Sequence, residues 1–121
     1  MKETIQKEYL RWKTLADDQD VAAELQSMDG NEEQIEDAFY RNLAFGTGGL
    51  RGVIGAGTNR MNIYTVAKAS QGLADYVNKQ FVPNKRSIAI SYDSRIRSDV
   101  FARVAAGVFA ANGIQSYIYK E

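Results

Sequence analysis

Six glycines in twelve consecutive positions mark the centre of the chain, where residues 46–57 read GTGGLRGVIGAG. Glycine destabilises helices and strands because its backbone has more conformational freedom to lose than that of any other residue. The segment therefore predicts a loop, or a short strand around residues 50–54 with a loop on either side. Because glycine has no Cβ, the backbone there can also approach a ligand closely.

The residues before this segment show a helical pattern throughout. Apolar side chains recur at helical spacing over residues 2–16 and predict an amphipathic helix. Asp18 or Asp20 is placed to cap a short second helix. Asn31, which is followed three residues later by a glutamine, resembles the start of a third helix. Residues 1–43 are therefore expected to form an N-terminal helical extension.

Beyond the glycines the pattern alternates between helix and strand. Asn62 is placed to cap a helix that must end before Pro83. Residues 87–93 then predict a strand, Ser98 caps a further helix, and residues 114–119 predict a second strand. Residues 87–119 therefore contain a strand, a helix and a strand. This order and length are typical of a right-handed crossover between parallel strands.

This order of elements predicts an α/β fold, a three-layer α/β/α domain with a mostly parallel sheet and the N-terminal helical extension. The domain is expected to comprise residues 44–121. The sequence ends two residues after the last predicted strand, and an open sheet edge at that point needs a cover. We therefore expect the chain to be one piece of a larger protein.

Two absent residue types remove several kinds of chemistry from the chain. Without cysteine there is no disulfide, thiolate nucleophile or cysteine-ligated metal, and without histidine there is no Ser-His-Asp triad. Fifteen basic and fifteen acidic residues give a net charge of zero, so bulk charge does not indicate nucleic-acid binding. No targeting signal, membrane span or metal-loop spacing is visible. We expect a cytoplasmic protein with no nucleic-acid or membrane partner and no metal site in this chain.

The glycine-rich segment has the composition of a phosphate-binding loop. Successive backbone N–H groups in such a turn can point at one anion. Thr47 and Thr58 supply hydroxyl donors, and Arg51 and Arg60 supply guanidinium groups that match phosphate oxygens. A turn that only redirects the chain explains the same glycines equally well. The segment is not a Walker loop, because no Gly-Lys-Ser/Thr follows it.

A second polar group follows the strand predicted at residues 87–93. Asp93 and Arg95 lie between that strand and the next helix, and open α/β sheets bind ligands outside the carboxyl ends of their strands. The alternative is that the two side chains pair with each other, or with the glycine-rich segment, and hold its shape. The sequence favours this supporting role, because no candidate base lies nearby.

Three short motifs carry a family resemblance. Residues 45–52 (FGTGGLRG), residues 55–62 (GAGTNRMN) and residues 90–95 (ISYDSR) together resemble the start of the α-D-phosphohexomutases. The match is best to the phosphoglucomutase/phosphopentomutase-like branch, and it runs from about residue 44 to residue 121. The helices before it resemble the helical leader of that branch.

The resemblance implies a four-domain enzyme that interconverts glucose 1-phosphate and glucose 6-phosphate, or the matching pentose phosphates. In the family, a phosphoserine in a T-A-S-H-N-P-like loop transfers phosphate through a bisphosphate intermediate. A D-x-D-x-D-R loop helps to hold Mg²⁺, and a glucose 1,6-bisphosphate-type activator is implied. Neither motif occurs in residues 1–121. The chain would then be the first domain, cut before the catalytic serine loop and inactive without the remaining domains.

The resemblance also assigns site residues. The family's active-site arginine falls on Arg51, which would stabilise charge on the transferring phosphoryl group. The residues expected to bind the substrate phosphate are Thr47, Gly48, Gly49, Arg51 and Arg60. Asp93 and Arg95 match the turn after the strand and are expected to support the site.

Two further interpretations stay open on the sequence. The chain could be a stand-alone module that binds a phosphorylated ligand or regulates another protein without catalysis. It could also be a folding unit with no function of its own. The sequence does not distinguish a glucose from a pentose substrate.

Overall fold

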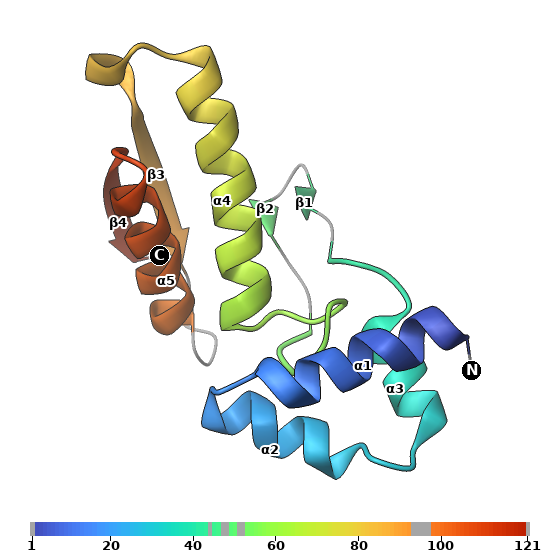
Figure 1. Cartoon of the computed structure of the whole chain (residues 1–121). Coiled ribbons are helices and arrows are strands. Elements are labelled where there is room, and N and C mark those ends of the chain that lie inside the picture. Colours follow the sequence, from blue (N-terminus) through green and yellow to red (C-terminus); the bar gives the residue numbers. More distant parts are fainter. Residues whose placement is uncertain (1, 44, 47–48, 51–52, 93–97, 121) are drawn as a thin grey trace. The chain divides into compact units, whose positions relative to one another are not determined.

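The computed structural model of the chain describes residues 2–43, 45–46, 49–50, 53–92 and 98–120 (Figure 1). It divides into two compact units, Met1–Thr65 and Val66–Glu121. The first unit begins with three helices, α1 (Glu3–Leu15), α2 (Gln19–Ser27) and α3 (Glu32–Phe39). The elements that follow the glycine-rich segment are α4 (Ile63–Gln80), the short 3-10 helix η1 (Pro83–Lys85), β3 (Ser87–Tyr92), α5 (Ser98–Ala111) and β4 (Gln115–Lys120). The domain boundary predicted after residue 43 stays a prediction.

Side-chain caps start the second and third helices as the sequence predicts. Asp18, rather than Asp20, caps α2, because its carboxylate accepts a hydrogen bond from the backbone N–H of Val21 at 3.1 Å. Asn31 caps α3 by accepting a hydrogen bond from the backbone N–H of Gln34, also at 3.1 Å. The third helix ends at Phe39, so residues 40–43 are not helical, whereas the sequence predicts that they are.

The helices of the first unit bury one apolar cluster. Its buried members are Ile5, Tyr9, Val21, Leu25, Met28, Ile35, Ala38, Phe39 and Ala56. Edge-to-face ring contacts connect Tyr9 with Phe39, Phe39 with Trp12, and Trp12 with Tyr64, at centroid separations of 5.8, 5.6 and 5.5 Å. Ala56 belongs to the glycine-rich segment and Tyr64 to the first turn of α4. The cluster therefore joins both of these later segments to the N-terminal helices.

The second unit contains the predicted strand, helix and strand. Strands β3 and β4 are parallel neighbours, with Ser87 opposite Gln115 and Tyr92 opposite Lys120 (Figure 1). Helix α5 packs against both strands, and Ile88 and Ile90 share an apolar cluster with side chains of α4 and α5. Helix α5 begins at Ser98, and the cap predicted at this residue stays a prediction because its side chain lies outside what the structure describes. The chain has the predicted α/β fold class.

In the glycine-rich segment, where the sequence predicts a loop or a short strand around residues 50–54, the structure describes two short pairings, and residues 51–52 lie outside the described residues. Strand β1 (Phe45–Gly46) pairs antiparallel with β2 (Gly49–Leu50), and Ile54 forms a single parallel bridge with Met61. Among the described residues, neither pairing joins the sheet of β3 and β4. The many glycines give this segment little intrinsic strand preference, so its path depends on contacts with other parts of the chain.

In the parts of the chain that the structure describes, no helix is both long enough and apolar enough to cross a lipid bilayer.

The Tyr9 side chain is buried, and its hydroxyl has hydrogen-bond partners in and after α2. Its hydroxyl donates a hydrogen bond to the backbone oxygen of Leu25 at 2.8 Å and lies 3.2 Å from a carboxylate oxygen of Asp29. Burial, and then the carboxylate of Asp29, raise the pKa of Tyr9 to about 12. The neutral hydroxyl is therefore the form that the folded first unit favours.

This pKa predicts a specific pH dependence of stability. A tyrosine in the unfolded chain loses its proton near a pH of about 10, and folded Tyr9 does so only near pH 12. The stabilisation is therefore complete below the unfolded pKa and is lost as pH rises through the folded pKa. In urea titrations at constant ionic strength, the free energy of unfolding of the wild type should fall more steeply over this alkaline range than that of Tyr9→Phe. Parallel pH profiles would contradict the assignment.

Candidate functional site

Of the residues predicted to bind phosphate, the structure describes Gly49, Thr58 and Arg60. Gly49 lies in β2, where it is paired with Gly46 of β1. Arg60 lies between the bridge at Ile54 and the start of α4. The predicted site residues outside the described residues are Thr47, Gly48, Arg51, Asp93 and Arg95. Their roles stay predictions.

The end of helix α3 is held by residues from the far side of the glycine-rich segment. The last carbonyl oxygens of a helix have no partner within it. Here the backbone N–H of Asn59 donates to the oxygen of Ala38 at 2.9 Å, and the side-chain amide of Asn59 donates to the oxygen of Asp37 at 3.1 Å. Arg60 also donates to the oxygen of Asp37, at 3.2 Å. These donors replace the hydrogen bonds that a longer helix would have made.

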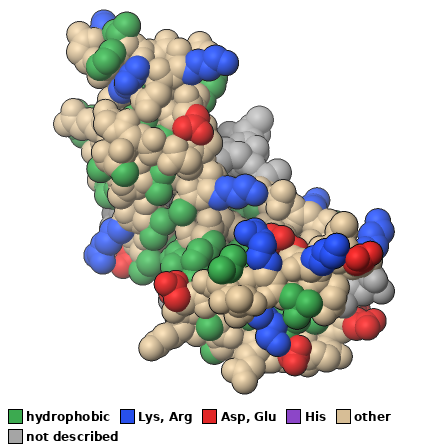
Figure 2. All heavy atoms as spheres, in the orientation of Figure 1, with side chains coloured by type: hydrophobic (Ala, Val, Ile, Leu, Met, Phe, Trp, Pro, Cys, Tyr) green, Lys and Arg blue, Asp and Glu red, His purple; other side chains and the backbone are tan. Residues whose placement is uncertain are grey.

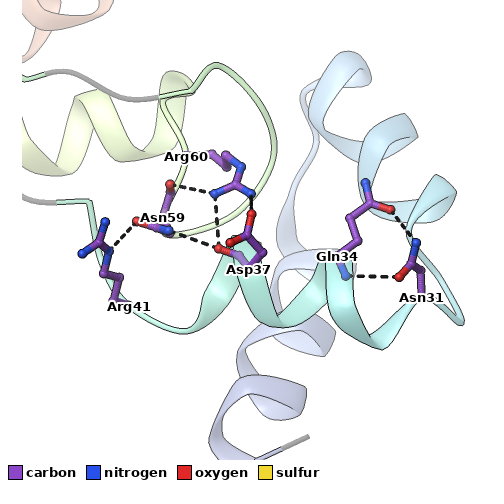
Figure 3. Close-up of polar contacts among 6 residues, drawn as sticks. All are labelled: Asn31, Gln34, Asp37, Arg41, Asn59 and Arg60. Carbon is purple, nitrogen blue, oxygen red and sulfur yellow. Dashed lines mark hydrogen bonds and ion pairs between the residues drawn. The ribbon is translucent and has the colours of Figure 1, made fainter.

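Arg60 is thus engaged within the chain. Its guanidinium forms an ion pair with the carboxylate of Asp37 and donates to the backbone oxygen of Asn59 at 3.2 Å (Figure 3). The Arg60 side chain is only 16% exposed, whereas that of Asp37 is 67% exposed. A cation at this point also complements the partial negative charge at the C-terminal end of a helix. The contact between Arg60 and a substrate phosphate stays a prediction.

Further hydrogen bonds extend this pairing beyond the end of α3. The Thr58 hydroxyl donates to the backbone oxygen of Arg41 at 2.8 Å, and the backbone N–H of Leu43 donates to the oxygen of Thr58 at 2.8 Å. The guanidinium of Arg41 donates to the side-chain oxygen of Asn59 at 3.0 Å. We call the paired residues 37–43 and 57–60 the stem. The Thr58 hydroxyl, predicted from the sequence as a phosphate donor, is instead a stem donor.

Gly57 allows the two sides of the stem to approach each other. Its φ is +123°, in the region that favours glycine. A Cβ at this position would lie 2.5 Å from the backbone oxygen of Ala38 and 2.8 Å from the Ala38 Cβ. Both observations exclude an unstrained side chain at this position.

Two buried or half-buried polar side chains hold the residues just before the stem. The carboxylate of Glu24 in α2 accepts a hydrogen bond from the backbone N–H of Ala56 at 3.0 Å. Asn62 caps α4, as predicted, and its side-chain amide also donates to the backbone oxygens of Gly55 and Gly57 at 2.8 and 3.1 Å. Sequence reasoning identified the cap but not the bridge to the glycines.

The charges of the described residues form no obvious metal site. No group of three or more acidic residues that could hold a metal ion is present among them. On the face shown in Figure 2, basic and acidic side chains are interspersed rather than gathered by sign.

Comparisons with known proteins give one consistent result. Residues 42–120 match the family model described as phosphoglucomutase/phosphomannomutase, alpha/beta/alpha domain I, which agrees with the predicted fold class. The "Phosphopentomutase" of Pongo abelii is 39% identical over 100 residues, which cover 77% of this chain and 16% of that protein.

Two further relatives have similar coverage. The "Phosphoglucomutase" of Staphylococcus aureus (strain bovine RF122 / ET3-1) is 38% identical over 107 residues, or 88% of this chain and 19% of that protein. The "Probable phosphoribomutase" of Schizosaccharomyces pombe is 42% identical over 87 residues, or 70% and 15%. The chain thus spans less than one fifth of the length of these relatives. No solved structure matches it with comparable significance.

The close approach at Gly57 predicts a large loss of stability on substitution. Gly57→Ala should lower the free energy of unfolding by more than about 2 kcal/mol, because it combines backbone strain with a clash against a helix carbonyl. Urea unfolding followed by the fluorescence of Trp12, the only tryptophan, measures this change in the first unit.

Gly30→Ala is the matched control. Gly30 also has a positive φ, +84°, but a Cβ there would meet nothing within 4 Å. It should therefore cost only the backbone strain, about 1 kcal/mol. Equal losses in the two variants would show that the clash with Ala38 is relieved and that the stem tolerates a side chain.

Proposed function

The chain belongs to the phosphoglucomutase/phosphomannomutase family, and on this basis we propose that it is the N-terminal part of a phosphosugar mutase. The enzyme would interconvert glucose 1-phosphate and glucose 6-phosphate, or the matching pentose phosphates. The observation that carries the proposal is the match of residues 42–120 to domain I of the family. The names of the relatives, which include phosphopentomutase and phosphoglucomutase, support it.

The proposed reaction follows the family pattern. A phosphoserine would transfer its phosphate to the sugar phosphate, and the bisphosphate intermediate would return the other phosphate to the serine. A glucose 1,6-bisphosphate-type activator would start the cycle. Since the serine and aspartate motifs are absent from residues 1–121, we place the nucleophile in a part of the first domain outside these residues and the aspartate ligands of Mg²⁺ in the second domain of the full-length protein. When bound, Mg²⁺ would neutralise negative charge on the phosphoryl oxygens.

This chain would contribute the binding of a phosphate group. Backbone N–H groups of the glycine-rich segment, with Thr47 and Arg51, would surround the phosphate oxygens, and Arg51 would stabilise charge during transfer. The stem supports this proposal, because it holds both ends of the segment in place before a ligand arrives. Donors that are already in position need no reorganisation during the reaction. Asp93 and Arg95, which follow β3 in the sequence, would act as supporting residues.

An assay of the full-length protein tests the proposal directly. The purified protein, with Mg²⁺ and a trace of glucose 1,6-bisphosphate, is given glucose 1-phosphate and, separately, ribose 1-phosphate. Formation of the corresponding 6-phosphate or 5-phosphate is expected for at least one of them. If the full-length protein turned over neither sugar phosphate, the proposal would be overturned. In the same assay, residues 1–121 alone should show no turnover.

Arg51 gives the sharpest test within this chain. In the full-length enzyme, Arg51→Ala should lower kcat/KM by a factor on the order of 10² or more, because a charge-stabilising donor is lost from the transition state. Arg11→Ala is the control, since Arg11 pairs with Glu8 on the exposed face of α1. It should leave the rate unchanged within about twofold, as is usual for an exposed ion pair. An unchanged rate for Arg51→Ala would make Arg51 a structural residue.

A stand-alone binding module is the second candidate. It is favoured by one observation, the presence of the glycine-rich segment without either catalytic motif in residues 1–121. Titration of the chain with inorganic phosphate and with glucose 1-phosphate, followed by NMR of the amides in residues 46–60, tests it. Saturable shifts in a chain whose full-length protein has no mutase activity would support the module.

A further inference from the structure

We propose that Asn59 is a positioning residue for the glycine-rich segment. Through the stem, it fixes where the chain leaves α3 and where it returns from the segment. The inference rests on the proposed function, in which that segment binds the substrate phosphate. Asn59 itself would touch neither the substrate nor the reacting atoms.

Asn59 makes the central contacts of the stem. Its backbone N–H, side-chain amide nitrogen and side-chain oxygen each have a different partner, in Ala38, Asp37 and Arg41. The residue is only 9% exposed. Asn59 thus connects the end of α3 to the residues that follow the helix through three of its own polar groups. Loss of the Asn59 side chain would leave Arg60 as the remaining side-chain donor to the backbone oxygen of Asp37, and would remove the hydrogen-bond acceptor of the Arg41 Nε.

The position of the stem makes these contacts relevant to the loop. Residues 44–56 lie between its two sides, so the stem closes the base of the whole glycine-rich segment. The return of the chain is also held by Glu24 at Ala56 and by Asn62 at Gly55. Opening the base would restore much of the conformational freedom that closure removes. The rate of a reaction falls steeply when the groups that align its reactants are displaced by about 1 Å.

Helix α3 provides a matched control at its opposite end. Asn31 and Asn59 are both asparagines that satisfy backbone groups of this helix, one at its start and one at its end (Figure 3). Removal of the Asn31 cap should destabilise the protein by about 1 kcal/mol, without touching the stem. A comparison of the two therefore separates stabilisation of α3 from positioning of the segment.

The first test is the steady-state kinetics of the full-length protein. Asn59→Ala should lower kcat/KM by about tenfold or more, mainly through kcat, because displaced groups stabilise the transition state less. Asn31→Ala should stay within about twofold of the wild type, although both variants lower Tm. Asn59→Asp keeps the acceptor for Arg41 but loses the donor to Asp37, and should give an intermediate loss. If Asn59→Ala does not fold, Asn59→Asp carries the same comparison with Asn31→Asp.

The second test does not depend on activity. Hydrogen exchange of the full-length protein, followed by mass spectrometry, should show faster exchange across residues 53–56 in Asn59→Ala, by about tenfold, but not in Asn31→Ala. Unchanged exchange there would overturn the inference whether or not the protein is a mutase. An inactive wild type with faster exchange in Asn59→Ala would overturn the proposed function and leave the positioning role supported. An active wild type, with equal kinetics in the Asn59 and Asn31 variants, would overturn the positioning role alone.

Discussion

The backbone oxygens at the end of helix α3 require hydrogen-bond donors, and the way they obtain them organises the first unit. Asn59 and Arg60 supply donors from beyond the glycine-rich segment, so the helix can end at Phe39 while the backbone oxygens of Asp37 and Ala38 keep hydrogen-bond partners. That solution brings Gly57 against Ala38, where a Cβ would lie 2.5 Å from a carbonyl oxygen. The stem therefore satisfies the end of α3 and forms the base of the glycine-rich loop. Its close approach to Ala38 also requires a glycine at position 57.

These contacts show that the N-terminal helices help to hold the residues that follow the glycine-rich segment. The sequence presents them as an extension that precedes the domain, but they supply the acceptors at Asp37 and Ala38 and the carboxylate of Glu24 that hold residues 56–60. The ring contacts from Tyr9 to Tyr64 also join α1 to the first turn of α4. A phosphate-binding loop needs donors that stay aligned when its ligand is absent. In the proposed mutase, the helical leader would provide that rigidity.

Much of the secondary structure could be predicted, because its determinants are local. The caps at Asp18, Asn31 and Asn62 each act on a backbone group two or three residues away, and the residues alone show that spacing. For the glycine-rich segment the sequence left a loop and a short strand around residues 50–54 both open, for the opposite reason. A segment so rich in glycine has almost no intrinsic preference, so its pairing is decided by distant partners.

The candidate site also combines features that local sequence predicts with contacts that only the tertiary structure shows. The sequence by itself determined the helices, the parallel strand pair and the family, because periodicity, caps and contiguous motifs are properties of neighbouring residues. Only the tertiary structure decided that Asn59 serves the end of α3, that the Thr58 hydroxyl binds Arg41, and that Arg60 pairs with Asp37. These partners lie 17 to 23 residues apart. No local pattern encodes such a pairing, since it forms only when the helices and the returning chain meet around a common core.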